Sequence, residues 1–320
     1  MKQISDVDTT MSSRPPRPPT PMGLPRRKYG ETGFAFTIRQ LMLQGIPGRC
    51  VSEFYDHHPI SEAGVLAALA RRGRDDPALL TVDDLFEFDQ DHYGGLAAVD
   101  ALARRAGVGA GSRVLDVCAG LGGPARFLSR RRGARVVALE LHAGRAQGAA
   151  RLNRLVNERR VAVVRGDALR LPFGSGAFDA CLSQEALLHI ADKPAVLREC
   201  HRVLTPGGRL AFTDWVARPG LGDRERERLW EWMAATTLQT LESYRALIGH
   251  AGFSAIDAED LSEEWRPILR RRLEMYRALR GDTIARLGEQ RYQEYDQLYT
   301  FFVGLVEDGK VGGGRFSATG

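Results

Sequence analysis

The sequence is poor in cysteine and contains no long hydrophobic run. Its 320 residues include four cysteines, and Cys50, Cys118, Cys181 and Cys200 show no paired spacing and no metal-finger pattern. We therefore expect reduced thiols in a cytoplasmic protein without a metal site. No apolar run approaches the ~20 residues that a membrane-spanning helix needs, so we expect no membrane span.

The chain also lacks a strong charge of one sign. It has 45 basic and 40 acidic residues and a formal net charge of +5. Much of the excess lies in residues 1–30, a segment rich in proline and arginine that we expect to be a disordered tail. Two arginine triplets, residues 130–132 and 270–272, follow helical apolar patterns and are interpreted as solvated helix faces. Nucleic acid is therefore not an expected partner.

The most informative stretch is residues 114–124, VLDVCAGLGGP. It predicts a buried strand that ends in a glycine-rich turn and opens a helix. A second apolar run, residues 136–139, is followed directly by Glu140. Glycine lets a ligand approach the backbone closely, and a carboxylate can accept hydrogen bonds from both ribose hydroxyls. This pairing is typical of an α/β sheet that binds a nucleoside.

These residues leave two cofactors open. Gly120, Gly122 and Ala125 fit the dinucleotide pattern G-x-G-x-x-A, which alone is weak evidence for an NAD-dependent oxidoreductase. Asp116 opposes that interpretation, because its carboxylate would repel a pyrophosphate but could reach an amino-acid ammonium group. Asp167 follows a third apolar run and could accept a hydrogen bond from an adenine amino group. Together these features favour S-adenosylmethionine.

Two further strand-like segments, residues 178–183 and 204–210, complete the pattern. From about residue 95 to 260 the chain resembles the class I S-adenosylmethionine-dependent methyltransferases. The resemblance implies a Rossmann-like, doubly wound α/β sheet of seven strands in the order 3-2-1-4-5-7-6, with strand 7 antiparallel. Cys118 departs from the family, which usually has glycine there. We expect the loop to survive and Cys118 to avoid dihedrals that only glycine adopts easily.

The chain is expected to have three parts. Residues 1–30 form the tail, residues 31–110 a helical lead-in or lid, and residues 111–320 the cofactor-binding domain. Residues 262–308 are interpreted as a helical pair inserted before a short last strand at residues 314–317. In proteins that this chain resembles, such a lead-in commonly lies over the cofactor and the substrate.

The resemblance places the cofactor at the carboxyl ends of the strands. The residues expected to bind it are Asp116, Cys118, Gly120, Gly122, Glu140, Leu141, Asp167, Ala168, Ser183 and Gln184. Methyl transfer from a sulfonium is an in-line displacement, so positioning supplies much of the catalysis. The reaction requires neither a catalytic metal nor a covalent nucleophile.

Four residues are candidates for catalysis. Gln184 and Glu185 follow the fourth strand and would face the transferred methyl group. His189 lies about one helical turn later and could orient the substrate or remove a proton, or simply bond a neighbouring loop. Tyr93 could stack on the cofactor or hydrogen-bond its methionine end. Further titratable candidates in the lead-in loops are Tyr55, Asp56, His58, Asp91 and His92.

Within the family, the resemblance is to the small-molecule branch that holds sarcosine and dimethylglycine N-methyltransferases. Residues 91–95, 116–123 and 183–189 carry it. It implies a small amine acceptor such as glycine, sarcosine or dimethylglycine, which needs no dedicated base. The alternative is C- or O-methylation of a quinol, tocopherol-like or sterol-like acceptor, with His189 or His58 as the base. The sequence leaves this choice and the oligomeric state open.

Overall fold

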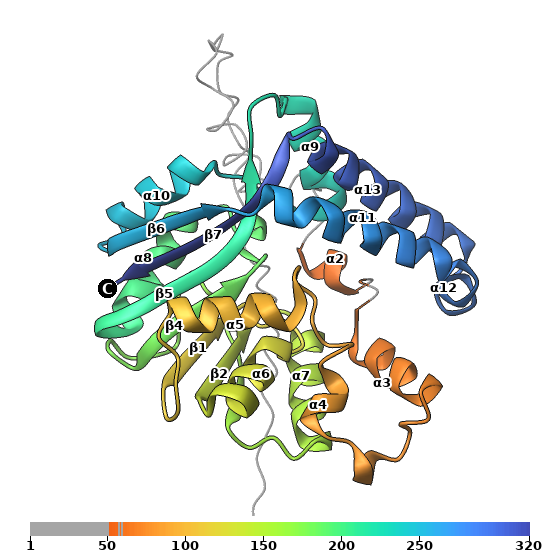
Figure 1. Ribbon diagram of the computed structural model, residues 1–320, viewed down its shortest axis with the longest axis horizontal. Coiled ribbons are helices and arrows are strands. Elements are labelled where there is room, and N and C mark those ends of the chain that lie inside the picture. The colour runs from red at the N-terminus through yellow and green to blue at the C-terminus, as the bar shows by residue number, and fades with distance from the viewer. Residues whose placement is uncertain (1–50, 57, 59) are drawn as a thin grey trace, which may run out of the picture. The chain divides into compact units, whose positions relative to one another are not determined.

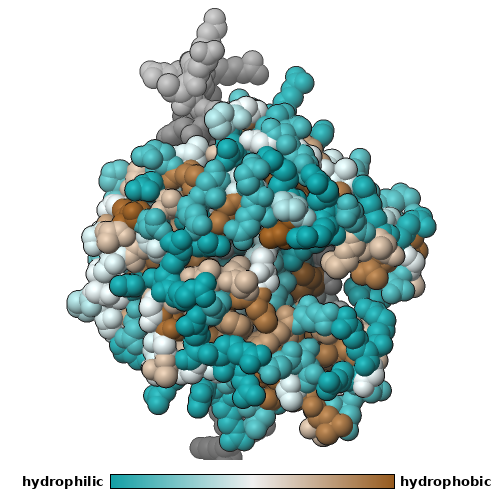
Figure 2. All heavy atoms as spheres, viewed as in Figure 1, coloured by the Kyte–Doolittle hydropathy of each residue, from teal (hydrophilic) through white to brown (hydrophobic). Residues whose placement is uncertain are grey.

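The computed structural model describes residues 51–320 apart from residues 57 and 59. The expected disordered tail, the first part of the expected lead-in and Cys50 lie outside the described residues. Within the described part, no helix combines the length and the apolar character needed to cross a membrane. Figure 2 shows hydrophilic residues over most of the visible face, with hydrophobic residues between them in small patches.

A seven-stranded sheet with the order β3-β2-β1-β4-β5-β7-β6 crosses the molecule (Figure 1). Its strands are β1 (Arg113–Val117), β2 (Arg135–Glu140), β3 (Val161–Arg165), β4 (Phe178–Gln184), β5 (Leu204–Ala217), β6 (Ser254–Asp260) and β7 (Val311–Thr319). The first five strands pair in parallel, whereas β7 is antiparallel to both β5 and β6. The predicted fold class and strand order are therefore confirmed, and the last strand is longer than expected.

Helices cover both faces of the sheet. One face packs against α5 (Gly95–Arg105), α6 (Gly123–Arg132) and α7 (Ala143–Leu155), and the other against α8 (Lys193–Val203) and α10 (Leu241–His250). Val114 and Leu115 are neighbours in β1 but belong to two separate cores. Successive side chains of a strand point to opposite faces, so each strand contributes to both cores.

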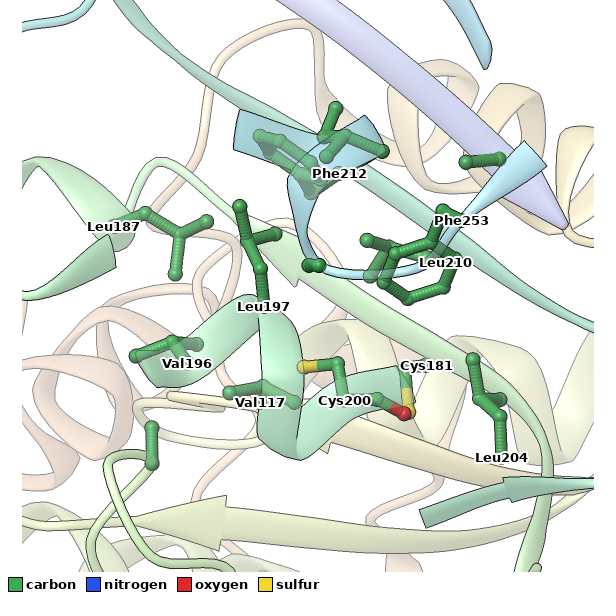
Figure 3. Close-up of a cluster of buried hydrophobic side chains, with 14 of the residues drawn as sticks. Val117, Cys181, Leu187, Val196, Leu197, Cys200, Leu204, Leu210, Phe212 and Phe253 are labelled. Atoms are coloured by element: carbon green, nitrogen blue, oxygen red, sulfur yellow. The ribbon is translucent and has the colours of Figure 1, made fainter. Parts of the chain in front are cut away.

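The core beneath α8 and α10 is drawn in Figure 3, where Leu197 and Cys200 of α8 lie over Cys181 of β4. Phe212 of β5 stacks on Phe316 of β7 at 4.8 Å, which joins the parallel and antiparallel parts of the sheet. Each such side chain contributes about 1.5–3 kcal/mol when fully buried. The three described cysteines are free thiols, as expected.

Between β6 and β7 the chain forms three helices, α11 (Ser262–Ala278), α12 (Arg280–Leu287) and α13 (Glu289–Glu307). They lie together in Figure 1, beside α9 (Asp223–Met233). Trp215 of β5 stacks on Phe302 of α13 with ring centres 3.9 Å apart. Trp265 and Leu269 of α11 pack into the same core. The insertion is thus anchored to the end of β5 by aromatic burial.

The described lead-in begins with α2 (Val51–Asp56), α3 (Glu62–Arg71) and α4 (Val82–Leu85), with a 3-10 turn at Pro77–Leu79. Val65 and Leu69 of α3 and Leu85 of α4 are buried against Leu152 of α7. This small core anchors the lead-in beside the helix that follows β2.

A buried guanidinium joins the lead-in to the sheet. Arg126 of α6 is 0% exposed, and its Nε donates to Asp89 of the lead-in at 3.0 Å. Its two terminal nitrogens donate to the Asn153 side chain of α7 at 2.8 Å and to the Leu121 carbonyl at 2.6 Å. Three segments distant in the chain are thereby fixed to one planar group.

Removing this cation should be costly. We expect Arg126→Met to lower the free energy of unfolding by about 3–5 kcal/mol, because Asp89 would stay buried without its partner. Arg131→Met is the matched control, since Arg131 pairs with Asp83 at the surface and should contribute less than about 1 kcal/mol. Urea unfolding of both variants measures the difference, and equal losses would contradict the role given to Arg126.

Candidate cofactor and acceptor site

The glycine-rich turn lies between β1 and α6, where the chain takes three left-handed residues. Cys118, Gly120 and Gly122 have φ of +61°, +58° and +77°. Gly120 also permits a close approach, because a Cβ there would lie 2.6 Å from the Arg145 guanidinium. The expectation that Cys118 avoids the left-handed region is wrong. The turn imposes that conformation on cysteine, at a cost of about 1–2 kcal/mol relative to glycine.

Glu140 at the end of β2 connects two turns. One of its carboxylate oxygens accepts from the Gly120 amide and the other from the His142 amide, both at 2.8 Å. A carboxylate has about four lone-pair directions, and these two bonds use two of them. Glu140 therefore keeps acceptor capacity for the two hydroxyls of a ribose.

Two buried polar atoms in this region have no hydrogen-bond partner among the described residues. They are Oδ2 of Asp116, which is 3% exposed, and Nε2 of Gln184. Burial, and then the charge of Glu140, raises the pKa of Asp116 to about 7. Buried polar groups in proteins are nearly always paired, so unpaired ones point to a ligand. An acceptor and a donor of this kind fit the ammonium and carboxylate of an amino acid.

The remaining predicted cofactor residues lie at the same edge of the sheet, with different exposures. Leu141 follows β2 and is exposed, whereas Asp167 is exposed and Ala168 buried after β3. Ser183 of β4 donates through Oγ to the Val117 carbonyl of β1 at 2.9 Å. In this structure its hydroxyl therefore holds two strand ends together.

Glu185 and Tyr93 are brought together across 92 residues of sequence. The Tyr93 amide donates to one Glu185 carboxylate oxygen at 2.8 Å, and the Thr213 hydroxyl donates to the other at 2.6 Å. Burial raises the pKa of Glu185 to about 7 against these two bonds. The Tyr93 ring packs edge-on against Trp265, with the ring centres 4.9 Å apart. Glu185 therefore fixes the lead-in loop to the ends of β4 and β5.

His189 contacts Tyr55 of α2. Its Nδ1 lies 3.1 Å from the Ala234 carbonyl, which can only accept, so Nδ1 carries the proton. Nε2 is then an acceptor, and it accepts a hydrogen bond from the Tyr55 hydroxyl at 3.0 Å. Burial lowers the pKa of His189 to about 4, so the imidazole is neutral at physiological pH. The structure thus presents a neutral ring whose Nε2 lone pair accepts a hydrogen bond from a hydroxyl.

Charged groups surround this pair. Arg145 of α7 donates to Asp91 at 2.8 Å and lies over the Tyr55 ring at 4.5 Å. His58 accepts from the Ile60 amide through Nδ1. Burial alone would raise the pKa of Asp91, but His58, Arg145 and Arg272 hold it below its usual range. Asp56, by contrast, is exposed and contacts His142.

Arg272 corrects one interpretation of the sequence. Arg270 and Arg271 are exposed as expected, but Arg272 turns inward and donates to the carbonyls of Asp91 at 3.2 Å and His92 at 3.1 Å. It follows Leu269 by one helical turn, on the stripe that α11 buries. That periodicity was the sequence signal that could have identified Arg272. No sequence signal identified Arg145, because its role depends on the approach of the lead-in.

The doubly wound sheet, the glycine turn and the unpaired atoms of Asp116 and Gln184 fit an α/β protein that binds a nucleoside with an amino-acid group. Residues 115–212 match the family model described as a methyltransferase domain. The chain is 30% identical over 199 residues to the 27-O-demethylrifamycin SV methyltransferase of Amycolatopsis mediterranei, covering 61% of this chain and 73% of that protein. The chain belongs to the class I S-adenosylmethionine-dependent methyltransferases, which confirms the resemblance seen in the sequence.

Other relatives show the same domain in different contexts. Methyltransferase GfsG of Streptomyces halstedii is 36% identical over 177 residues, which is 54% of this chain and 64% of that protein. The glycine/sarcosine/dimethylglycine N-methyltransferase of Actinopolyspora halophila is 31% identical over 60% of this chain and 34% of that protein. The match therefore spans about two thirds of the first relative and one third of the second.

A solved structure shares the fold. Haemonchus contortus phosphoethanolamine N-methyltransferase 2, in complex with S-adenosylhomocysteine, superposes with a TM-score of 0.70 at 21% identity. The alignment covers 84% of this chain and 59% of that one. The cofactor of this family is S-adenosylmethionine, and the unpaired atoms of Asp116 and Gln184 fit its amino-acid end.

Asp116→Asn should separate stability from cofactor binding. The pKa of Asp116 is about 7 in the folded chain and 3.8 ordinarily, so the wild-type protein loses stability as pH rises through this interval. An amide does not titrate. We expect the variant to be more stable than the wild-type protein by about 2–4 kcal/mol at pH 8 and equally stable near pH 4, in urea unfolding without cofactor.

The same variant should bind S-adenosylmethionine roughly tenfold more weakly or worse, because the ammonium loses a charged partner. Isothermal titration calorimetry at pH 8 measures this. Equal stability of the two proteins at pH 8 would show that burial does not penalise the charged Asp116 carboxylate. Equal affinity would remove Asp116 from the cofactor site.

Glu140→Ala should weaken S-adenosylmethionine binding by about 1.5–3 kcal/mol, the usual contribution of hydrogen bonds to a charged group. Glu227→Ala, which removes an exposed carboxylate from α9, is the control and should leave the affinity unchanged. The dissociation constants come from titration calorimetry. If both variants bind as the wild-type protein does, the ribose is not bound at Glu140.

Proposed function

We propose that this protein transfers the methyl group of S-adenosylmethionine to a hydroxyl oxygen of a small-molecule acceptor. The observation that supports the proposal best is the neutral His189, whose Nε2 lone pair faces the Tyr55 hydroxyl at 3.0 Å. A ring in this state can take the proton that a hydroxyl must lose when its oxygen is methylated.

The cofactor residues have separate tasks. Asp116 and Gln184 would bind the amino-acid end, Glu140 the ribose, and the backbone at Gly120 and Gly122 would let the cofactor lie close to the turn. When bound, S-adenosylmethionine supplies an electrophilic methyl group on a sulfonium, which is already a good leaving group. Positioning of the acceptor oxygen then supplies much of the remaining rate.

His189 and Tyr55 act on the acceptor side. The bond from Nδ1 to the Ala234 carbonyl fixes the tautomer, so Nε2 accepts the acceptor proton as the oxygen–methyl bond forms. When the acceptor hydroxyl takes the place of Tyr55 at Nε2, the Tyr55 hydroxyl can donate to the acceptor oxygen and orient it. Burial raises the pKa of Tyr55 further above its usual value, so its hydroxyl stays protonated.

The charges around His189 favour a neutral acceptor over an ammonium. Of the buried carboxylates described above, Asp91 binds Arg145, and Glu185 accepts from Thr213 and Tyr93. An ammonium substrate would have to displace one of these partners. A hydroxyl acceptor has to replace only another neutral hydroxyl, that of Tyr55, at His189 Nε2. The rifamycin relative is named for a 27-O-demethyl substrate, which supports oxygen as the atom methylated.

An amine acceptor, the first expectation from the sequence, stays the second candidate. The similarity to the glycine/sarcosine/dimethylglycine N-methyltransferase supports it, and a neutral amine would not require a base. In that case Glu185 or Asp91 would attract the ammonium after a rearrangement of its present partners.

The acceptor class is tested with trideuteromethyl S-adenosylmethionine and a panel of acceptors read by product mass. The panel holds glycine, sarcosine, dimethylglycine and ethanolamine derivatives beside quinols, sterols and macrocyclic alcohols. Each alcohol is paired with the amine that replaces its hydroxyl. Transfer to an alcohol and not to its paired amine is the expected result. Transfer confined to the amines would overturn the proposal in favour of the second candidate.

His189→Asn should slow turnover by about 10²–10⁴-fold with little change in S-adenosylmethionine affinity, because it removes the acceptor nitrogen and leaves the cofactor contacts. His250→Asn on the exposed end of α10 is the control and should retain full turnover. Steady-state kinetics and calorimetry give the two quantities. A loss of cofactor affinity equal to the loss of turnover would place His189 outside the reaction centre.

A further inference from the structure

Lys193, the first residue of α8, is a buried cation that the reaction scheme above does not use. The chain has 45 basic residues, of which only Lys2, Lys28, Lys193 and Lys310 are lysines. Lys193 is 1% exposed. A lysine ammonium is a compact point charge, whereas a guanidinium is a planar fork, so the two fit different sets of acceptors. A lone buried lysine in an arginine-rich chain points to acceptors that converge on one point.

The acceptors are indeed convergent. Lys193 Nζ donates to the Ile190 carbonyl at 3.0 Å and to the Thr237 carbonyl and hydroxyl, both at 2.6 Å. These bonds use all three ammonium protons. They tie the segment that follows β4, which carries His189, to the segment that follows α9.

That second segment also carries the partner of the His189 ring. Ala234, three residues before Thr237, has a φ of +51° and presents the carbonyl that receives His189 Nδ1. Between them, the Thr236 amide donates to the Leu188 carbonyl at 2.9 Å. The two segments therefore lie side by side, and Lys193 closes one end of the contact.

Asp214 of β5 holds the other side of His189. It is 0% exposed, and one of its oxygens accepts from the Leu188 amide at 3.2 Å while the other accepts from the Tyr244 hydroxyl. The residues before and after His189 are thus each bonded to a buried charged side chain. Lys193 and Asp214 also favour each other's charged form.

Two free-energy costs oppose a lysine at this position. A cation in the first turn of a helix opposes the helix dipole, and burial lowers the pKa of Lys193 to about 8. An apolar side chain of similar length would avoid both costs but would leave the Ile190 and Thr237 oxygens without this donor. The lysine therefore has a role that an apolar residue would not perform.

We propose that Lys193 is a positioning residue that fixes the orientation and tautomer of the His189 ring by tying Ile190 to Thr237. The proposal rests on the function proposed above for His189 and adds the residue that acts through it. Without the ammonium, the two segments would keep the Thr236–Leu188 bonds but lose the tie from Ile190 to Thr237, so the Ala234 carbonyl would be held less firmly opposite Nδ1 and the proton could move to Nε2. The ring would then present a donor where the reaction needs an acceptor.

The test compares Lys193→Met with the wild-type protein, and Lys310→Met is the control at a partly exposed pair with Glu225. Nitrogen-15 NMR of the imidazoles, without cofactor, reports which nitrogen of His189 is protonated. We expect a single Nδ1–H tautomer in the wild-type protein and the control, and a mixture in Lys193→Met. Turnover of Lys193→Met should fall by about tenfold or more, with acceptor KM and S-adenosylmethionine affinity within about twofold.

An unchanged His189 spectrum in folded Lys193→Met would overturn the proposal. If that variant does not fold, Thr237→Val decides by the same spectrum, because it removes one acceptor of the ammonium: mixed tautomers support the proposal and an unchanged ring rejects it. If the wild-type protein methylates no acceptor of the panel, the proposed function fails, and the imidazole spectrum still decides the role of Lys193.

Discussion

The site depends on the buried guanidinium of Arg126. It binds Asp89 of the lead-in, Asn153 of α7 and the Leu121 carbonyl of the glycine turn, so one side chain holds three walls of the site. Gly123 completes the arrangement, because a Cβ there would lie 2.3 Å from the Asp89 carbonyl. The lead-in can therefore lie directly on the start of α6, and residues 90–93 reach the ends of β4 and β5.

The cofactor side of the site combines unpaired polar atoms with a strained backbone. Buried Asp116 and Gln184 have polar atoms without partners in the described chain, and Cys118 takes a conformation that glycine adopts more easily. The acceptor side differs, because Tyr55, His189, Asp91, Arg145 and Glu185 are all paired. The cofactor side thus has polar groups left to satisfy, whereas the acceptor side offers an oriented ring in a network that is already neutralised.

The sequence was sufficient for the sheet and for the edge at which the candidate residues meet, because local signals carry both. Apolar runs separated by helical segments predicted the strands. Residues at the carboxyl ends of parallel strands had to meet at one edge, as Gly120 and Glu140 do. It was insufficient where the signal is not local. Arg145 and Arg272 act on a loop that only tertiary packing brings near, and the bond from the Tyr93 amide to the Glu185 carboxylate joins residues 92 positions apart. The left-handed Cys118 shows that a turn's geometry can outweigh the preference of its residue.

A crystal structure of the protein with S-adenosylhomocysteine tests the central claim most directly. We expect the ribose hydroxyls at Glu140, the ammonium at Asp116 Oδ2 and the cofactor carboxylate near Gln184 Nε2, so that both unpaired atoms gain partners. We also expect His189 to keep its Nδ1 bond to Ala234 and to face the sulfur side of the ligand. A nucleoside bound elsewhere, or Asp116 and Gln184 still unpaired beside the ligand, would contradict this claim.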